Sequence, residues 1–256
     1  MMRAEPARPA DPGSFSVGWY GKIPGTGDFI ARRLPAAFSE PWDRWLQQAM
    51  DGSRERLGAH WRDAFLSMPV WRFVLSPGML SANAWAGLML PSVDAVGRYF
   101  PLTVASALPS ASLDLVATLL AAAPWFDGVE EIALTAILPN ADTGAIDAAL
   151  ARRPFQREWL NFPDDSADAT VPIRGAKARM LAVPLHGDAA PAADLRALQE
   201  QLCEPCAAWL AGESEVFGRC ALLCESLPAA EQFCAMMDGR WAEHGWGRRD
   251  PRGAAA

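Results

Sequence analysis

Three short apolar segments in the first half of the chain place the strongest constraint on its fold. They are Val70–Leu75, Trp85–Leu90 and Leu102–Leu108, and proline and glycine residues separate them. Short runs of branched and aromatic residues between such punctuation are typical of strands. The connections are brief, whereas parallel neighbours need a crossover of a dozen or more residues. The three segments therefore predict neighbouring antiparallel strands.

Helical periodicity precedes and follows these strands. Apolar residues recur at spacings of three and four from Trp42 to Leu57, with Ser39 as the expected N-cap and Pro41 in the first turn. A shorter helix is expected at His60–Ser67. The other expected elements are strands at Phe15–Tyr20, Met180–Leu185 and Glu215–Cys224, two or three helices within Ser112–Arg153 broken at Pro124 and Pro139, one helix through Leu195, Leu198, Leu202, Trp209 and Leu210, and a last helix at Ala229–Asp238. This order predicts an α/β fold, with a mostly antiparallel central sheet packed with helices as a layered sandwich.

A single domain is expected over residues 14–246. The chain has 256 residues, of which 51% are hydrophobic, and this is enough for one large core. Residues 1–13 and 247–256 are poor in large apolar side chains, so we expect flexible tails there. The polar stretch Asn161–Arg179 is expected to be a long surface loop and is the only candidate boundary.

The charge balance excludes some classes of partner. The 23 basic and 30 acidic residues give a net charge of −7, which argues against a nucleic-acid partner because phosphate neutralisation needs clustered lysine and arginine.

No apolar core follows Met1, and the longest apolar run, Leu115–Phe126, is too short to span a bilayer. We therefore expect a cytoplasmic protein that does not insert into membranes and keeps its five cysteines reduced.

Two motifs carry most of the functional signal. The first is GWYGKIPGTGDFIARRLP, from Gly18 to Pro35, and the second is PSVDAVGRYFPL, from Pro91 to Leu102. Both combine glycine, proline, aromatic and charged residues. Glycine permits positive φ and close backbone approach, and proline fixes φ, so each loop is expected to have one shape. Such a loop is either a structural corner or a binding surface.

Established nucleotide and metal motifs do not fit these loops or the cysteines. The glycine pattern departs from the P-loop at Ser16 and Ile23, and from the dinucleotide fingerprint at Ile30. The four thiols of Cys203, Cys206, Cys220 and Cys224 resemble a zinc site only loosely. On a strand, Cys220 and Cys224 would be about 13 Å apart at roughly 3.3 Å per residue, which is too far for one tetrahedral ion. Core packing is favoured for these cysteines.

Carboxylates leave one catalytic alternative open. Asp28 and Asp94 could form an acid/base or metal site if the two loops converge, as in a metal-dependent hydrolase or phosphatase-like enzyme. The favoured interpretation is structural: Asp28 caps backbone amides of its turn, and Asp94 or Asp28 pairs with Arg98. The neighbours Trp71 and Arg72 are a further candidate interface, because tryptophan and arginine are enriched in binding hot spots.

The two motifs resemble the TagF family, also called ImpM, of type VI secretion-associated proteins. The following helix SEPWDRWLQQAM and the C-terminal FCAMMDGRW add to this resemblance, whereas residues 110–212 match only in general character. The resemblance implies a cytoplasmic accessory protein that is not an enzyme and uses no cofactor or metal. It further implies post-translational repression of type VI secretion assembly through binding of the forkhead-associated scaffold protein of that system. The residues that we expect to shape the partner-binding surface are Lys22, Asp28, Arg32, Arg33, Trp71, Arg72, Asp94, Arg98 and Tyr99.

Overall fold

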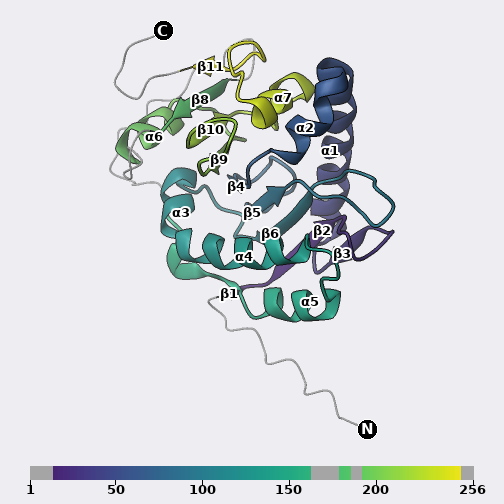
Figure 1. Ribbon diagram of the computed structural model, residues 1–256. Coiled ribbons are helices and arrows are strands. Elements are labelled where there is room, and N and C mark those ends of the chain that lie inside the picture. The colour runs from purple at the N-terminus through teal and green to yellow at the C-terminus, as the bar shows by residue number, and fades with distance from the viewer. Residues whose placement is uncertain (1–13, 163–178, 186–191, 249–256) are drawn as a thin grey trace.

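The computed structural model describes residues 14–162, 179–185 and 192–248, and its centre is a broad twisted sheet (Figure 1). The nine described strands of this sheet are β2 Val17–Gly21, β3 Ile30–Arg32, β4 Trp71–Leu75, β5 Trp85–Leu90, β6 Leu102–Ala107, β8 Met180–Pro184, β9 Ala207–Ala211, β10 Cys220–Cys224 and β11 Gly247–Arg248. Their order across the sheet is β11-β8-β10-β9-β4-β5-β6-β2-β3. All neighbours are antiparallel except β8 and β11, which are parallel. A separate ribbon pairs β1 Ser14–Phe15 with β7 Phe155–Gln156.

Helices cover both faces of the sheet. One face carries α1 Ala36–Leu57, α2 Trp61–Leu66 and α7 Ala230–Asp238, and the other carries α3 Leu115–Ala121, α4 Ala123–Ala136, α5 Thr143–Ala151 and α6 Ala192–Gln199. Short 3-10 helices lie at Gly58–His60 and Arg157–Trp159. This arrangement confirms the predicted α/β sandwich. No helix in the described residues has both the length and the apolar character needed to cross a membrane.

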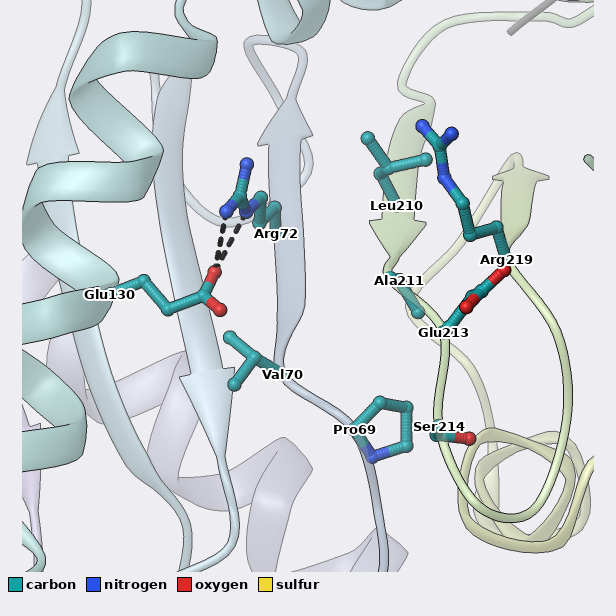
Figure 2. A pocket seen from close by; sticks show the side chains of 10 residues that line it. Pro69, Val70, Arg72, Glu130, Leu210, Ala211, Glu213, Ser214 and Arg219 are labelled. Carbon is teal, nitrogen blue, oxygen red and sulfur yellow. Dashed lines mark hydrogen bonds and ion pairs between the residues drawn. The ribbon is translucent and has the colours of Figure 1, made fainter. Parts of the chain in front are cut away.

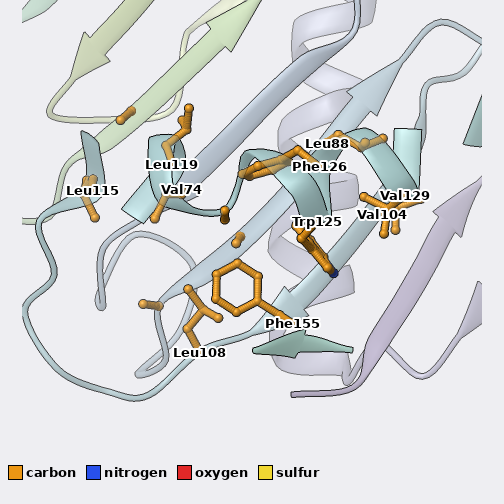
Figure 3. Packing of buried hydrophobic residues seen from close by; sticks show 14 of the residues in the cluster. Val74, Leu88, Val104, Leu108, Leu115, Leu119, Trp125, Phe126, Val129 and Phe155 are labelled. Atoms are coloured by element: carbon orange, nitrogen blue, oxygen red, sulfur yellow. The ribbon is translucent and has the colours of Figure 1, made fainter. Parts of the chain in front are cut away.

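Two hydrophobic clusters, one on each face, form the core. In β9, Trp209 joins the cluster under α1 and α7, whereas Ala208 faces the cluster under α3 and α4. On the α3–α4 face, Trp125 and Phe126 pack edge to face at 4.9 Å, and Trp125 packs similarly on Phe155 at 5.0 Å (Figure 3). The central strands are therefore buried on both faces, which explains why they read as continuous apolar runs rather than alternating ones.

One predicted helix is wrong in its second half. Leu195 and Leu198 do lie in α6, but this helix ends at Gln199 and the chain then returns to the sheet. Trp209 and Leu210 belong to β9, where hydrogen bonding to β4 and β10 on either side fixes an extended backbone. A short apolar run buried on both faces does not distinguish helix from strand by its periodicity.

The first helix begins earlier than predicted. The helix α1 starts at Ala36, with Pro35 as its N-cap in an extended conformation. Ser39 is therefore inside the helix, where its hydroxyl donates to the Pro35 carbonyl, and Pro41 also lies inside. The physical reason is Phe38, which is fully buried and stacks on Trp42 at 5.3 Å, so the apolar face extends one turn further back.

The predicted strand Glu215–Cys224 is wrong in its first half, because Ser214 and Phe217 close a turn there and β10 begins only at Cys220. Most of the other predicted elements agree closely with the structure. The strand β5 has the predicted bounds, β4 and β6 are each one residue shorter, and α7 begins one residue later than expected. Pro124 lies in the first turn of α4. The strand β11 occupies the first two residues of the expected C-terminal tail. The rest of that tail, the expected N-terminal tail and residues 163–178 of the expected surface loop lie outside the described residues.

Candidate functional site

The two sequence motifs meet at one end of the sheet. We call residues 22–29, which follow β2, and residues 91–101, which join β5 to β6, the paired loops. The backbone N–H of Ala95 donates to the carbonyl of Thr26 at 3.1 Å, and the Arg98 guanidinium donates to the carbonyl of Gly27. The paired loops are therefore one structural unit, although about seventy residues separate them in the sequence.

Glycine makes the approach of the paired loops possible. Gly21 ends β2 with φ +136°, and a Cβ atom at this position would lie 2.3 Å from the carbonyl oxygen of Pro101. Real side chains do not tolerate that distance, and they rarely adopt that φ. Gly21 therefore sets where the first loop leaves the sheet and passes beside the second.

A buried ion pair lies beneath the paired loops. The Lys22 Nζ donates to Asp94 Oδ2 at 2.9 Å, and the side chains are 7% and 0% exposed. Arg98 Nε donates to the same oxygen at 2.7 Å from a more exposed position. Burial alone would raise the pKa of Asp94, but the hydrogen bonds from Lys22, Arg98 and the Val96 N–H outweigh it, and the pKa lies well below its usual range.

The second loop is a tight turn organised by Asp94. Its Oδ1 accepts the backbone N–H groups of Val96 at 3.0 Å and Arg98 at 2.8 Å. Gly97, with φ +84°, donates its N–H to the Asp94 carbonyl, and a bridge pairs Val93 with Tyr99. Asp94 thus satisfies a lysine, an arginine and two backbone amides, which fixes the shape of this loop.

Aromatic side chains attach the paired loops to the helices. Phe29 packs on Tyr20 at 5.7 Å and on Phe100 at 4.8 Å, and its ring also covers Lys22 Nζ at 4.9 Å. The Tyr20 hydroxyl donates to Asp43 of α1 at 2.6 Å. Burial, together with this carboxylate, raises the pKa of Tyr20.

Tyr99 makes the matching contact to the second helix. Its ring packs edge to face on Trp61 at 5.5 Å and on Phe65 at 5.8 Å, both in α2. Tyr99 therefore anchors its loop to the helical layer, and only part of its surface reaches solvent.

Apolar side chains stand exposed on this rigid base. Val96, at the tip of the second loop, is 68% exposed, and Phe29 is 46% exposed. The first loop also approaches the connection between α4 and α5, because a Cβ on Gly25 would lie 3.3 Å from the Ala141 carbonyl. In that connection, the side chain of Leu138 is 56% exposed.

The exposed apolar residues escape prediction because an apolar side chain is ordinarily assigned to the core. They lie beside glycine and charged residues in a turn, and this sequence context is what could have identified them as exposed.

The two candidate carboxylates have different environments. Asp94 is buried and pairs with Arg98, as the structural interpretation expects. Asp28 is exposed, and among the described residues no hydrogen bond or ion pair reaches its carboxylate. The expectation that Asp28 caps backbone amides is wrong, because Asp94 makes such contacts instead. Within the described part of the chain, no group of three histidine, cysteine, aspartate or glutamate residues could hold a metal ion.

Arg32 and Arg33 follow the paired loops and differ in role. Arg32 is exposed, and within the described residues its guanidinium donates only to the carbonyl of Ala31, at 3.1 Å. Arg33, with φ 55°, donates Nε to the Val17 carbonyl at 2.7 Å and Nη1 to both carboxylate oxygens of Asp147 at 2.8 Å. Asp147, in α5, also accepts the indole N–H of Trp19 at 2.8 Å.

This arrangement makes Arg33 a link between helix and sheet. Burial alone would raise the pKa of Asp147, but the hydrogen bonds from Arg33 and Trp19 outweigh it and lower the pKa. The sequence motif contains Arg33 but gives no sign of its distant partner, so the link between α5 and the β2–β3 hairpin could not be predicted.

Trp71 and Arg72 point to opposite faces of β4. Trp71 is fully buried under α7, and its indole N–H donates to the Met236 carbonyl at 3.1 Å. Arg72 faces α4, where Glu130 and Asp127 bind it at 2.7 Å. Successive strand residues alternate between faces, so the two cannot form one surface.

The cysteines are core residues, as predicted. Cys206, Cys220 and Cys224 are buried, and Cys203 is partly buried. Cys220 and Cys224 lie at the two ends of β10. Burial raises the pKa of the Cys206 thiol to about 12 and also raises the pKa of the Cys220 and Cys224 thiols. These thiols are therefore protonated near neutral pH.

Comparison with known proteins identifies the family. A family model described as the TagF N-terminal domain, type VI secretion system-associated, matches residues 18–153 of the 256. The crystal structure of PA0076 from Pseudomonas aeruginosa PAO1 is similar to this chain, with 36% identity and a TM-score of 0.71 over 88% of this chain and 95% of that one. The comparison with curated proteins finds no match. Because the family model covers more than half of the sequence, including both loop motifs, this protein belongs to the TagF family of type VI secretion system-associated proteins.

Proposed function

We propose that this protein is a cytoplasmic, non-catalytic repressor of type VI secretion assembly that binds the forkhead-associated scaffold protein of the system. The paired loops supply the binding surface, and binding withholds the scaffold from the membrane complex. The observation that carries the proposal is the exposure of Val96 and Phe29 on loops that Asp94 and its partners hold rigid.

Rigidity supports the assignment of this surface to binding. A surface that already has its bound shape loses less conformational entropy on association. Apolar residues surrounded by a polar rim are the usual arrangement at the centre of a protein interface. Here Val96 and Phe29 are the apolar centre, and Asp28, Arg32 and the 57% exposed side chain of Arg98 provide the rim.

The alternative, a metal-dependent hydrolase that uses Asp28 and Asp94, has weaker support. A catalytic carboxylate needs a free oxygen for a proton, a water or a metal ion. Both oxygens of Asp94 are already engaged, by Lys22 and Arg98 on Oδ2 and by two backbone amides on Oδ1. Lys22 and Asp94 therefore shape the surface from beneath it.

The proposal is tested by purifying the tagged full-length protein from a bacterium that expresses its type VI secretion system. We expect the forkhead-associated scaffold protein to co-purify, and overproduction of the wild-type protein to reduce effector secretion. Recovery of no scaffold from cells that express it would overturn the proposed partner. Metal-dependent hydrolysis that Asp28→Asn abolishes would instead support the enzyme.

A further inference from the structure

A pocket of about 260 Å³ lies where β4 begins and β9 ends, on the sheet face that carries α3 and α4 (Figure 2). Its floor is apolar and is formed by Pro69, Val70, Leu210 and Ala211. The paired loops lie at the same end of the sheet, because β5 ends beside the start of β4 and the second loop follows β5. The second loop leads into β6, and the distance between β4 and β6 is two strand spacings, or roughly 10 Å.

The hollow exists because of a glycine. The last paired row of the sheet here is Trp71, Ala211 and Cys220, so the next residues along the three strands are Val70, Gly212 and Arg219. Gly212 contributes no side chain between its two neighbours, and a Cβ placed on it would meet no heavy atom within 4 Å. The sheet surface is therefore open at this position.

Available carboxylate oxygens in the lining favour a cationic ligand. Arg72 is already paired: its Nε and Nη2 contact Glu130 Oε2 at 2.9 and 2.7 Å, and Nη2 contacts Asp127 at 2.7 Å. Among the described residues, no donor reaches Glu130 Oε1 or the exposed carboxylate of Glu213. Asp127 does not line the pocket, so the lining has two carboxylates and two guanidinium groups, and its acceptors for a ligand are Glu130 Oε1 and the Glu213 carboxylate.

The positions of the side chains agree with this reading. In Figure 2, the second carboxylate oxygen of Glu130 lies on the side of Val70, whereas the guanidinium of Arg219 lies beside Leu210. Glu130 Oε1 and the Arg219 guanidinium therefore lie at different parts of the apolar floor.

The wall on the β9–β10 side is preformed. Ser214 Oγ donates to the Phe217 carbonyl at 3.0 Å and accepts the Phe217 N–H at 3.1 Å, which closes a compact turn. Phe217 in turn packs on Trp71 at 6.0 Å and on Trp241 at 5.2 Å. Small-molecule pockets are usually about 300–1,000 Å³, so this smaller one suits a single side chain.

We propose that this pocket binds an arginine or lysine side chain presented by a protein partner. The apolar floor contacts the methylene stem, and Glu130 Oε1 and Glu213 bind the charged head. The net charge of −7 favours a partner segment that is basic. The pocket is thus a second contact point beside the paired loops. The statement that the partner is the scaffold protein rests on the proposed function, whereas the binding of a basic side chain does not.

The experiment is an NMR titration of the full-length protein with N-acetyl-arginine amide, with the neutral N-acetyl-citrulline amide as the control ligand. In the variant Gly212→Leu, the new side chain fills the hollow. The matched control variant is Gly218→Leu, in the same hairpin, because Gly218 has equally open space and does not line the pocket. Neither glycine has a left-handed φ, so both variants are expected to fold. Should Gly212→Leu not fold, Glu213→Gln serves in its place.

We expect the arginine amide to shift the resonances of Val70, Gly212 and Glu213 in the wild type and in Gly218→Leu. Binding should weaken at least tenfold in Gly212→Leu and for the citrulline amide. Equal binding by Gly212→Leu, or equal binding of the two amides, overturns the proposal. If the wild type does not bind the scaffold at all, the proposed function fails, but the amide titration still decides whether the pocket binds a basic side chain.

Discussion

Lys22 and Asp94 form an ion pair across the paired loops, with 2.9 Å between Nζ and Oδ2 and both side chains buried. Each charge depends on the other, because an ionised group buried without a partner carries a large desolvation cost. Asp94 also holds the backbone of its own loop. The shape of the proposed binding surface therefore depends on the Lys22–Asp94 ion pair, which lies buried beneath that surface.

Asp94→Asn should destabilise the protein strongly. The substitution leaves Lys22 buried without a counter-charge, and breaking a buried pair in this way costs about 3–5 kcal/mol. Urea unfolding measures the difference. Asp28→Asn is the matched control, since Asp28 is exposed, and it should change the free energy of unfolding by no more than about 0.5 kcal/mol. Equal effects of the two substitutions would show that Asp94 has no structural role.

The contribution of Asp94 should disappear in acid. Its pKa is lower in the folded state than the value of about 3.9 expected in the unfolded chain. A group of this kind contributes stability that is fully present above the unfolded pKa and is lost as the pH falls toward the folded pKa. The difference in unfolding free energy between wild type and Asp94→Asn should therefore shrink only below about pH 4. A difference that shrinks between neutral pH and pH 5 contradicts this account.

Gly21→Ala should separate the paired loops or unfold the protein. The new methyl group would lie 2.3 Å from the Pro101 carbonyl oxygen, at a φ of +136° that alanine disfavours. We expect a loss well above the roughly 1 kcal/mol that a compatible glycine-to-alanine change can gain. Gly27→Ala is the control, because a Cβ at Gly27 meets nothing within 4 Å. Thermal unfolding of both variants measures the contrast, and similar melting temperatures would refute it.

Arg33 and Asp147 should be energetically coupled. Asp147 binds Arg33 through both carboxylate oxygens and also accepts the Trp19 indole N–H. Asp147→Asn should cost about 1.5–3 kcal/mol, the range for hydrogen bonds to charged groups. A double-mutant cycle with Arg33→Ala, measured by urea unfolding, should give a coupling energy of about 0.5 kcal/mol or more. Additive single effects would mean that Arg33 does not link α5 to the sheet.

The central strands were predictable because their signal is local. The segment Trp85–Leu90 is apolar throughout and is bounded by loops, and the structure keeps those bounds for β5. Trp209 shows the limit of local reasoning, because only pairing with β4 and β10 decides that its segment is a strand. The start of α1 depends on Phe38, whose burial adds one turn to the apolar face that the periodicity from Trp42 to Leu57 defines.

The candidate site was predictable in location but not in its internal arrangement. The glycine and proline pattern indicates both loops, and the expectation that Asp94 or Asp28 pairs with Arg98 contains the observed partner, Asp94, without selecting it. The burial of Lys22 against Asp94 depends on the convergence of loops about seventy residues apart, which no local pattern encodes. The exposure of Val96 and the hollow above Gly212 likewise come from tertiary structure.

The most direct test of the central claim is calorimetric titration of the purified scaffold protein with the wild type and two surface variants. Val96→Asp places a charge at the tip of the paired loops, where the side chain is 68% exposed. The control variant, Phe162→Asp, changes another apolar residue, whose side chain is 49% exposed. Phe162 lies far from the paired loops, because the carbonyl of its neighbour Asn161 accepts the N–H of Asp114, which follows the opposite end of β6. Both variants should keep the stability of the wild type within about 0.5 kcal/mol. The account predicts a Kd at least tenfold higher for Val96→Asp, or about 1.4 kcal/mol, and an unchanged Kd for Phe162→Asp. A folded Val96→Asp variant that binds the scaffold as tightly as the wild type would contradict it.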